Sequence, residues 1–174
     1  MKKIGLLSDT HGWFNPKILD FFKGCDEIWH AGDIGSTEVA DRLSAFKTLR
    51  AVYGNVDGQE LRLMFPRIQI FTVEDVKIVM THIGGYPGRY ETGMTLLLTN
   101  EKPDIFISGH SHILKVMRDT KLNLLHINPG AAGNSGFHKV ITMIRFQIEG
   151  KEISNMEVYE MDRKMAPNDY LMPY

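Results

Sequence analysis

The stretch "GLLSDTHGW", residues 5–13, joins an apolar run to a group of polar residues. The apolar run ends at Leu7, and Asp9 and His11 follow it closely. Ser, Asp, Thr and Gly are typical of turns and helix N-caps, so the stretch taken alone indicates a turn. A carboxylate and an imidazole at the end of a buried strand also suit a ligand site. The rest of the chain decides between these two interpretations.

The first third of the chain alternates between two patterns. Short apolar runs predict strands at residues 3–7, 27–30 and 49–53. Between them, apolar residues recur at helical spacing in residues 16–22 and 37–46. This β-α-β-α-β order indicates parallel strands joined by crossover helices. In open α/β sheets, ligands bind at the carboxyl ends of such strands.

The remainder of the chain is richer in strands. Residues 60–67 are expected to form a connection and residues 91–100 a helix. We expect one domain over residues 1–162 and an irregular tail, residues 163–174, that belongs to the same domain. Turn signals separate the strands, most of which pair antiparallel after residue 113. The expected strands are residues 68–73, 76–81, 105–108, 114–118, 122–127, 138–148 and 153–159.

The composition limits the classes of function. The chain has 174 residues, enough for one domain with a full hydrophobic core. Its formal net charge is -1 and its Lys and Arg are scattered, so we expect no extended nucleic acid as a partner. The single cysteine, Cys25, excludes an internal disulfide, and no apolar run is long enough for a membrane span or signal peptide. We expect a cytoplasmic protein, as a monomer or as a homo-oligomer such as a dimer or tetramer.

Asp, Asn or His residues follow five of the expected strands closely. Because parallel strands end at one edge of a sheet, these side chains are expected to lie together. Carboxylate, amide and imidazole groups suit Mn, Fe, Co, Ni or Zn, and a set this large fits two ions that share a bridging carboxylate. The candidate metal ligands are Asp9, His11, Asp33, Asn55, His82, His110 and His112.

The motifs around these residues occur in a characteristic order. They are "SDTHG" at 8–12, "HAGD" at 30–33, "GNVD" at 54–57, "TH" at 81–82, "SGHSH" at 108–112 and "INPG" at 127–130. This ordered set resembles the calcineurin-like metallophosphoesterase superfamily, and more closely its short prokaryotic YfcE-type phosphodiesterase branch. The resemblance implies an α/β (α+β) fold, a four-layer α-β-β-α sandwich of two mixed sheets flanked by helices.

The resemblance also implies a dinuclear centre. One divalent ion would take Asp9, His11, Asp33 and His112, and the other would take Asp33, Asn55, His82 and His110, so that Asp33 bridges. We expect Mn²⁺, with Ni²⁺, Co²⁺, Fe²⁺ and Zn²⁺ as alternatives.

The implied reaction is attack on phosphorus by a metal-bridging hydroxide, with Asn55 and Asp33 as catalytic residues. Two carboxylates, two divalent ions and one hydroxide leave a single positive charge, which a monoanionic diester neutralises. The expected substrate is therefore a small phosphodiester.

One departure from the pattern concerns the proton for the leaving group. Large superfamily phosphatases carry His directly after the motif Asn, whereas this chain has Val56 there. Asp57 is then a candidate catalytic acid, and Tyr86, Arg89 and His138 are candidate substrate contacts.

The Gly-rich run "THIGGYPGRY", residues 81–90, suits either a phosphate-binding loop or a flexible one. Three alternatives to a phosphodiesterase stay open: a non-catalytic metal-binding interaction scaffold of the same fold, a metal-stabilised structural domain and a phosphomonoesterase.

Overall fold

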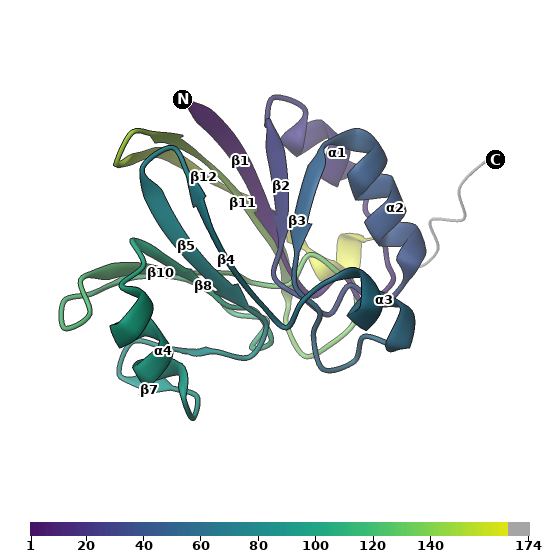
Figure 1. Ribbon diagram of the computed structural model, residues 1–174. Helices are drawn as coiled ribbons and strands as arrows, with labels where there is room; N and C mark the ends of the chain where they lie inside the picture. Colours follow the sequence, from purple (N-terminus) through teal and green to yellow (C-terminus); the bar gives the residue numbers. More distant parts are fainter. Residues whose placement is uncertain (167–174) are drawn as a thin grey trace.

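The computed structural model describes residues 1–166. Two five-stranded sheets face each other, and helices lie on their outer sides (Figure 1). Both sheets contain parallel and antiparallel pairs. The expected four-layer α-β-β-α sandwich of two mixed sheets is therefore confirmed.

The first sheet has the order β12-β11-β1-β2-β3. Its parallel part consists of β1 (Lys2–Leu7), β2 (Glu27–His30) and β3 (Thr48–Ala51). On the other side of β1, the long strand β11 (Val140–Glu149) pairs antiparallel with β1, and β12 (Glu152–Asp162) pairs antiparallel with β11. The carboxyl ends of β1, β2 and β3 consequently lie at one edge.

Two helices cover the outer face of this sheet. They are α1 (Lys17–Phe22) and α2 (Thr37–Phe46), which connect β1 to β2 and β2 to β3. Their apolar faces, with Phe22 and Leu43 fully buried, join one core cluster together with Ile28 of β2. This burial of helical apolar stripes follows the periodicity seen in the sequence.

The second sheet has the order β4-β5-β8-β10-β9. Its strands are β4 (Ile68–Val73), β5 (Val76–Thr81), β8 (Ile105–Ile107), β10 (Leu124–Pro129) and β9 (Leu114–Asp119). The three central strands run parallel, and the two edge strands pair antiparallel with them. The parallel part again directs its carboxyl ends to one edge.

The outer face of the second sheet is covered by helix α4 (Met94–Glu101) and a small hairpin. The helix begins later than residue 91 because Gly93, at its N-cap, is left-handed with φ 84°. The Gly-rich run contains a short hairpin, in which β6 (Gly85–Tyr86) and β7 (Arg89–Tyr90) pair antiparallel. The Pro87-Gly88 turn between them, with φ 85° at the glycine, has the residues of a type II turn.

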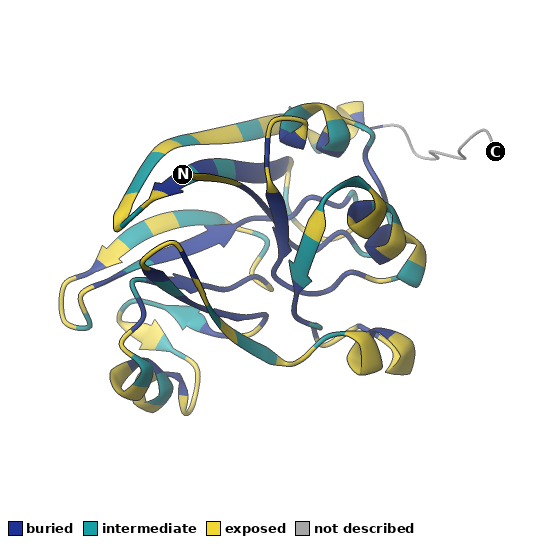
Figure 2. Cartoon of the chain, turned by 45° about the horizontal axis from the view of Figure 1, so that its top comes forward, coloured by how far each residue is buried: buried dark blue, intermediate teal, exposed yellow. Residues whose placement is uncertain are grey.

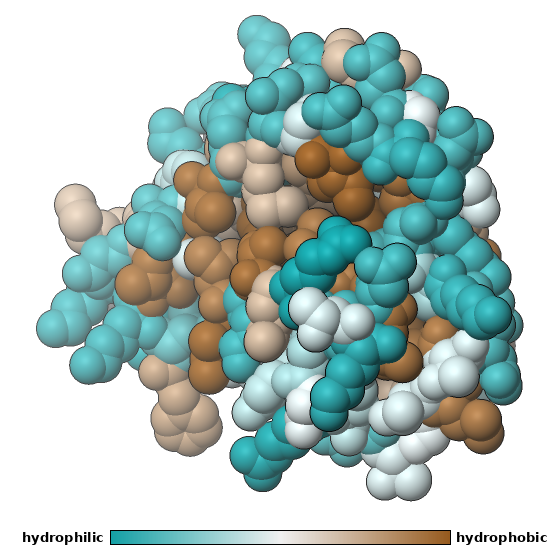
Figure 3. All heavy atoms as spheres, turned by 90° about the vertical axis from the view of Figure 1, so that its left-hand side faces the viewer, coloured by the Kyte–Doolittle hydropathy of each residue, from teal (hydrophilic) through white to brown (hydrophobic). Residues whose placement is uncertain are grey.

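The main core lies between the sheets. Residues such as Trp29, Ile78 and Phe146 are buried there, and the central strands of both sheets are largely dark blue in Figure 2. Seen from the left of Figure 1, apolar side chains reach the surface in the middle of the face, surrounded by hydrophilic ones (Figure 3). Alternating inward-facing residues from both sheets therefore hold the two parallel edges in fixed relation.

A helix replaces one expected connection, and only the first part of the expected tail lies within the described residues. Residues 60–67 were expected to form a connection, but α3 spans Gln59–Met64. Only Leu61 of this short surface helix is buried, so the sequence carries no apolar stripe to reveal it. Arg163–Met165 form a 3₁₀ turn, whereas the rest of the expected tail from residue 167 lies outside the described residues. Within residues 1–166, no helix is long and apolar enough to span a membrane.

Candidate metal centre

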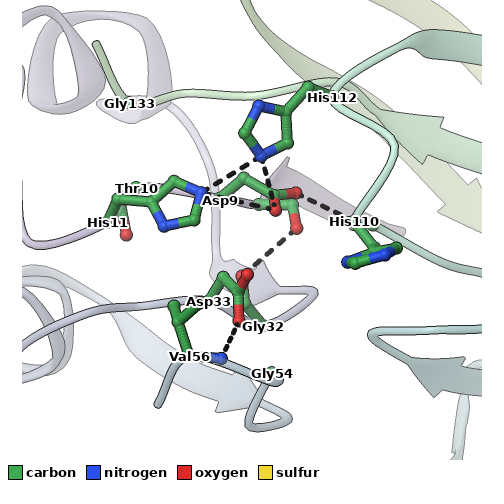
Figure 4. Close-up of polar contacts among 12 residues, drawn as sticks. Asp9, Thr10, His11, Gly32, Asp33, Gly54, Val56, His110, His112 and Gly133 are labelled. Atoms are coloured by element: carbon green, nitrogen blue, oxygen red, sulfur yellow. Dashed lines mark hydrogen bonds and ion pairs between the residues drawn. The ribbon is translucent and has the colours of Figure 1, made fainter. Parts of the chain in front are cut away.

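The candidate ligands lie on five loops that follow β1, β2, β3, β5 and β8. The parallel parts of the two sheets bring these loops to the same end of the sandwich. Figure 4 shows Asp9 in the middle, with His11 and His112 to one side and Asp33 and His110 to the other. The predicted grouping of strand-end residues is therefore observed.

The first group consists of Asp9, His11 and His112, whose ligand atoms lie within 4.8 Å of one another. Asp9 Oδ1 lies 3.2 Å from His112 Nε2 and 3.8 Å from His11 Nε2. The two Nε2 atoms are 3.1 Å apart. One carboxylate and two imidazoles facing a common point are a suitable donor set for a divalent transition metal.

The second group consists of Asp33, His82 and His110, again within 4.8 Å. His82 Nε2 lies 3.1 Å from Asp33 Oδ2 and 3.9 Å from Asp9 Oδ1, so the two groups adjoin. Asn55, the remaining candidate ligand, lines a cleft of about 470 Å³ together with Asp33 and His110. The structure thus brings all seven predicted residues to one place.

Two buried polar atoms indicate that the site suits a cation. Asp9 is fully buried, and its Oδ1 has no hydrogen-bond partner. His82 Nε2 is likewise buried and without a hydrogen-bond partner. A buried carboxylate oxygen next to imidazole nitrogens is costly unless a positive charge compensates it. The donor set and these unsatisfied atoms therefore fit divalent metal ions.

Hydrogen bonds to the outward-facing ring nitrogens of His82 and His112 favour tautomers that suit metal binding. His82 Nδ1 lies 2.8 Å from the Ala31 carbonyl oxygen and donates to it, which leaves Nε2, on the side of Asp33, as the ring nitrogen available to a metal. Similarly, His138 Nε2 lies 2.9 Å from the Gly133 carbonyl oxygen and donates to it. Its Nδ1 can then accept from His112 Nδ1, 3.1 Å away, which directs the His112 Nε2 lone pair into the site. Such outer hydrogen bonds are typical of metal-binding histidines.

The electrostatic balance favours positive charge between the two groups. Burial alone would lower the pKa of His82, but the neighbouring Asp33 and Asp9 carboxylates outweigh it and raise this pKa. Burial would raise the pKa of Asp33, but contact with His82 outweighs it and lowers that pKa. Burial lowers the pKa of His138 and keeps its ring neutral, as the tautomer argument requires.

Backbone strain is concentrated at the same residues. A positive φ is uncommon outside glycine and costs roughly 1–3 kcal/mol per residue, so it persists where the surrounding structure enforces it. Five candidate ligands adopt this conformation: Asp9 (φ 56°), His11 (φ 49°), Asp33 (φ 52°), His110 (φ 68°) and His112 (φ 57°).

Asp57 supports the loops instead of lining the cleft. This carboxylate is buried and accepts backbone hydrogen bonds from Gly35 at 2.7 Å, Gly54 at 2.7 Å and Ile34 at 3.2 Å. It thereby ties the loop after β2 to the loop after β3. The expectation that Asp57 donates a proton to a leaving group is not supported, because both oxygens face backbone amides.

The sequence did not indicate a second supporting residue, Asn128. Its Nδ2 donates to the Gly109 carbonyl oxygen at 2.8 Å and to Ser111 Oγ at 3.1 Å, and its Oδ1 accepts from Gly130 N at 3.0 Å. It therefore holds the loop that carries His110. Its position at the end of a buried strand within the "INPG" motif was the available signal.

The three candidate substrate contacts fall in two places. Tyr86 and Arg89 belong to the β6–β7 hairpin and line a neighbouring pocket of about 300 Å³, which also includes His110 and Lys115. His138 lines the metal cleft but makes its hydrogen bonds to the loop and to another imidazole.

Comparison with known proteins gives the family. The model of the calcineurin-like phosphoesterase superfamily domain matches residues 1–151, and the chain belongs to this superfamily. A protein described as a probable metallophosphoesterase from Methanocaldococcus jannaschii is 34% identical over 134 residues, which cover 74% of this chain and 67% of the relative.

Two solved structures illustrate the shared fold. A structure described as a novel archaeal phosphodiesterase has a TM-score of 0.72 at 24% identity and covers 90% of this chain and 99% of its own. Zn²⁺-complexed Vps29 from Entamoeba histolytica has a TM-score of 0.70 at 17% identity, covering 92% and 99%. The chain thus has a metallophosphoesterase fold and two Asp/His clusters of the kind that bind metal in this family.

Proposed function

We propose that this chain is a dinuclear metal-dependent phosphodiesterase of the short prokaryotic YfcE-type branch. The observation that carries the proposal is the pair of adjoining Asp/His groups around the buried, unsatisfied Asp9 oxygen. The fold shared with an archaeal phosphodiesterase supports it. The metals would be held by the seven residues named above, with Asp33 between them and Mn²⁺ as the first candidate.

The chemistry follows from this donor set. Divalent ions in such a pair supply Lewis acidity toward a phosphate and a nucleophile derived from water. The protein's own contribution is orientation: the loops carrying His11, His110 and Asn55 form the walls of the cleft where the phosphate would lie. Asn55 has an amide that can donate to a phosphate oxygen, which fits the catalytic role proposed for it.

A preference for diesters is favoured by the charge of the cleft. Among the described residues that line it, Asp33 is the sole Asp or Glu, and there is no Lys or Arg. Nothing in the cleft therefore offsets the second negative charge of a phosphomonoester. Arg89 and Lys115 lie in the neighbouring pocket, where they could contact a further part of the substrate.

The leaving group receives little help in this cleft. No Asp, Glu, Tyr or Lys other than Asp33 lines it among the described residues, and the hydrogen bonds of His138 are committed to Gly133 and His112. We therefore expect diesters with acidic leaving groups to be cleaved much faster than alkyl diesters. A flat dependence of the rate on leaving-group pKa would contradict this expectation.

The test compares bis(p-nitrophenyl) phosphate with p-nitrophenyl phosphate. Metal-stripped protein is reloaded with Mn²⁺, Ni²⁺, Co²⁺, Fe²⁺ or Zn²⁺, and Asp33→Asn serves as the inactive control. We expect metal-dependent cleavage of the diester, lost in the control, and weaker cleavage of the monoester. Preferential cleavage of the monoester would favour the phosphomonoesterase. Tight metal binding without cleavage of either ester would favour the scaffold or the structural domain.

A further inference from the structure

Three exposed apolar side chains surround the mouth of the metal cleft. Val56 is 54% exposed, Ile113 is 61% exposed and Phe137 is 105% exposed, and all three line this cleft. They come from the loops after β3, β8 and β10. We call this set the apolar rim. Large apolar side chains gathered at a functional cleft commonly mark a contact with a ligand.

Each rim residue is adjacent in sequence to a residue of the site. Val56 follows Asn55, Ile113 follows His112, and Phe137 precedes His138. Val56 is also held directly, because its backbone N–H donates to Asp33 Oδ1 at 3.0 Å (Figure 4). The loops that fix the candidate ligands therefore fix the rim at the same time.

The loop that carries Phe137 is anchored on both sides of it. Gly133 N donates to the Asp9 carbonyl oxygen at 3.0 Å, and the His138 ring contacts Gly133 at 2.9 Å. The Arg163 guanidinium donates to the Gly136 carbonyl oxygen. The exposure of Phe137 is consequently a property of an anchored loop, and its ring stands at the mouth of the cleft.

Beyond the candidate ligands, the cleft is lined by the apolar rim and by uncharged polar side chains. The polar ones are Ser111, Ser135 and His138, and no Lys, Arg or Glu lines the cleft among the described residues. The adjacent pocket, by contrast, contains Arg89, Glu91 and Lys115. An anionic ester group therefore has no Lys or Arg partner in the cleft, whereas an apolar group gains contact with the rim.

We propose that the substrate is a phosphodiester in which the ester group that is retained after cleavage is apolar, an aromatic ring or an alkyl chain, and packs on the apolar rim. This inference rests on the proposed phosphodiesterase function. It assigns Phe137 and Ile113 as specificity-determining residues, with Val56 completing the contact. The rim would act on substrate binding and not on the reacting atoms.

The experiment varies only the retained group. Phenyl p-nitrophenyl phosphate and methyl p-nitrophenyl phosphate share the same leaving group, so the ratio of their kcat/KM values reports contact with the retained one. We compare the metal-loaded full chain with Phe137→Ser and Ile113→Ser. Leu96→Ser is the matched control, since Leu96 is 67% exposed on α4, away from the cleft.

We expect Phe137→Ser to lower kcat/KM for the phenyl ester about tenfold and to leave the methyl ester within about twofold, because losing one apolar contact typically costs this much. Leu96→Ser should change neither. Calorimetry with the non-chromogenic diphenyl and dimethyl phosphates gives a readout without turnover. Diphenyl phosphate should bind more tightly to the wild-type chain, and Phe137→Ser should remove the difference.

Two results would overturn the proposal. If both rim variants keep the wild-type ratio of phenyl to methyl cleavage, the rim does not select the substrate, although the phosphodiesterase function stands. If Phe137→Ser instead lowers the oligomeric state in sedimentation analysis without changing that ratio, the rim is an interface between copies of the chain. Failure of the proposed function is distinct, because neither ester would then be cleaved.

Discussion

Asp57 could support the loops of the site or donate a proton to the leaving group, and these two roles make opposite predictions. Its carboxylate is 3% exposed and accepts three backbone hydrogen bonds, at 2.7, 2.7 and 3.2 Å, from the loops after β2 and β3. Leaving a buried donor without its acceptor costs about 1–3 kcal/mol. Asp57→Ala removes the acceptor of the buried Ile34 and Gly54 amides, at about 2 kcal/mol each, and should therefore lose about 4 kcal/mol of unfolding free energy.

Asp57→Asn is the better variant because it retains one acceptor oxygen and fills the same volume. Its amide nitrogen faces backbone N–H donors, so we expect a loss of about 2 kcal/mol in the free energy of unfolding. Urea denaturation of the metal-free chain measures this loss directly. Asp41→Asn, on the exposed face of α2, is the control and should stay within about 0.5 kcal/mol of wild type.

A leaving-group series separates the two roles. If Asp57 only holds the loops, Asp57→Asn lowers the rates for good and poor leaving groups by the same factor. If Asp57 donates a proton, the rates for poor leaving groups fall selectively while stability hardly changes. This second pattern would refute the structural role assigned here.

Three further predictions concern the surroundings of the site. A Cβ at Gly54 would lie 2.0 Å from Asp33 Oδ1, whereas one at Gly58 would meet nothing within 4 Å. We therefore expect Gly54→Ala to weaken Mn²⁺ binding, measured by calorimetry, at least tenfold, and Gly58→Ala to leave it unchanged. His138→Ala should weaken metal affinity roughly tenfold, because it removes the hydrogen-bond partner that fixes the tautomer of His112, and His138→Gln should restore part of the affinity. Equal affinities in the wild type and both variants would contradict this role of His138. Burial lowers the pKa of His126 to about 4 in the folded chain, so as the pH falls the unfolded chain binds a proton at this histidine before the folded chain does. Lowering the pH from about 7.5 to about 5 should therefore cost about 2 kcal/mol of unfolding free energy. Urea denaturation of His126→Gln should show no such pH-dependent loss.

The order of strands and helices could be predicted because its signals are local. The boundaries of β2, α2, β4 and β5 agree with the ranges expected from apolar runs and turn residues. Helix α3 and the β6–β7 hairpin were not predicted, since each is short, lies at the surface and buries little. Their formation depends on contacts with the rest of the domain and not on periodicity.

The candidate ligands could be predicted because each follows a strand directly. What the sequence could not indicate is how the backbone supports them. Asp57, Asn128 and His138 act through hydrogen bonds to residues distant in sequence or to backbone atoms of other loops. Asp57 illustrates this. Its place in the sequence close to Asn55 suggested a catalytic acid, but in the fold its carboxylate accepts hydrogen bonds from three backbone amides.

The central claim is that two metal ions share one site, and a Mn²⁺ titration followed by electron paramagnetic resonance tests it most directly. The two Asp/His groups adjoin, with His82 Nε2 3.1 Å from Asp33 Oδ2 and 3.9 Å from Asp9 Oδ1. We predict that the metal-stripped chain binds two equivalents of Mn²⁺ and gives the spectrum of a spin-coupled pair, which Asp33→Asn abolishes. Binding of a single equivalent, or of two equivalents without coupling, would contradict the account.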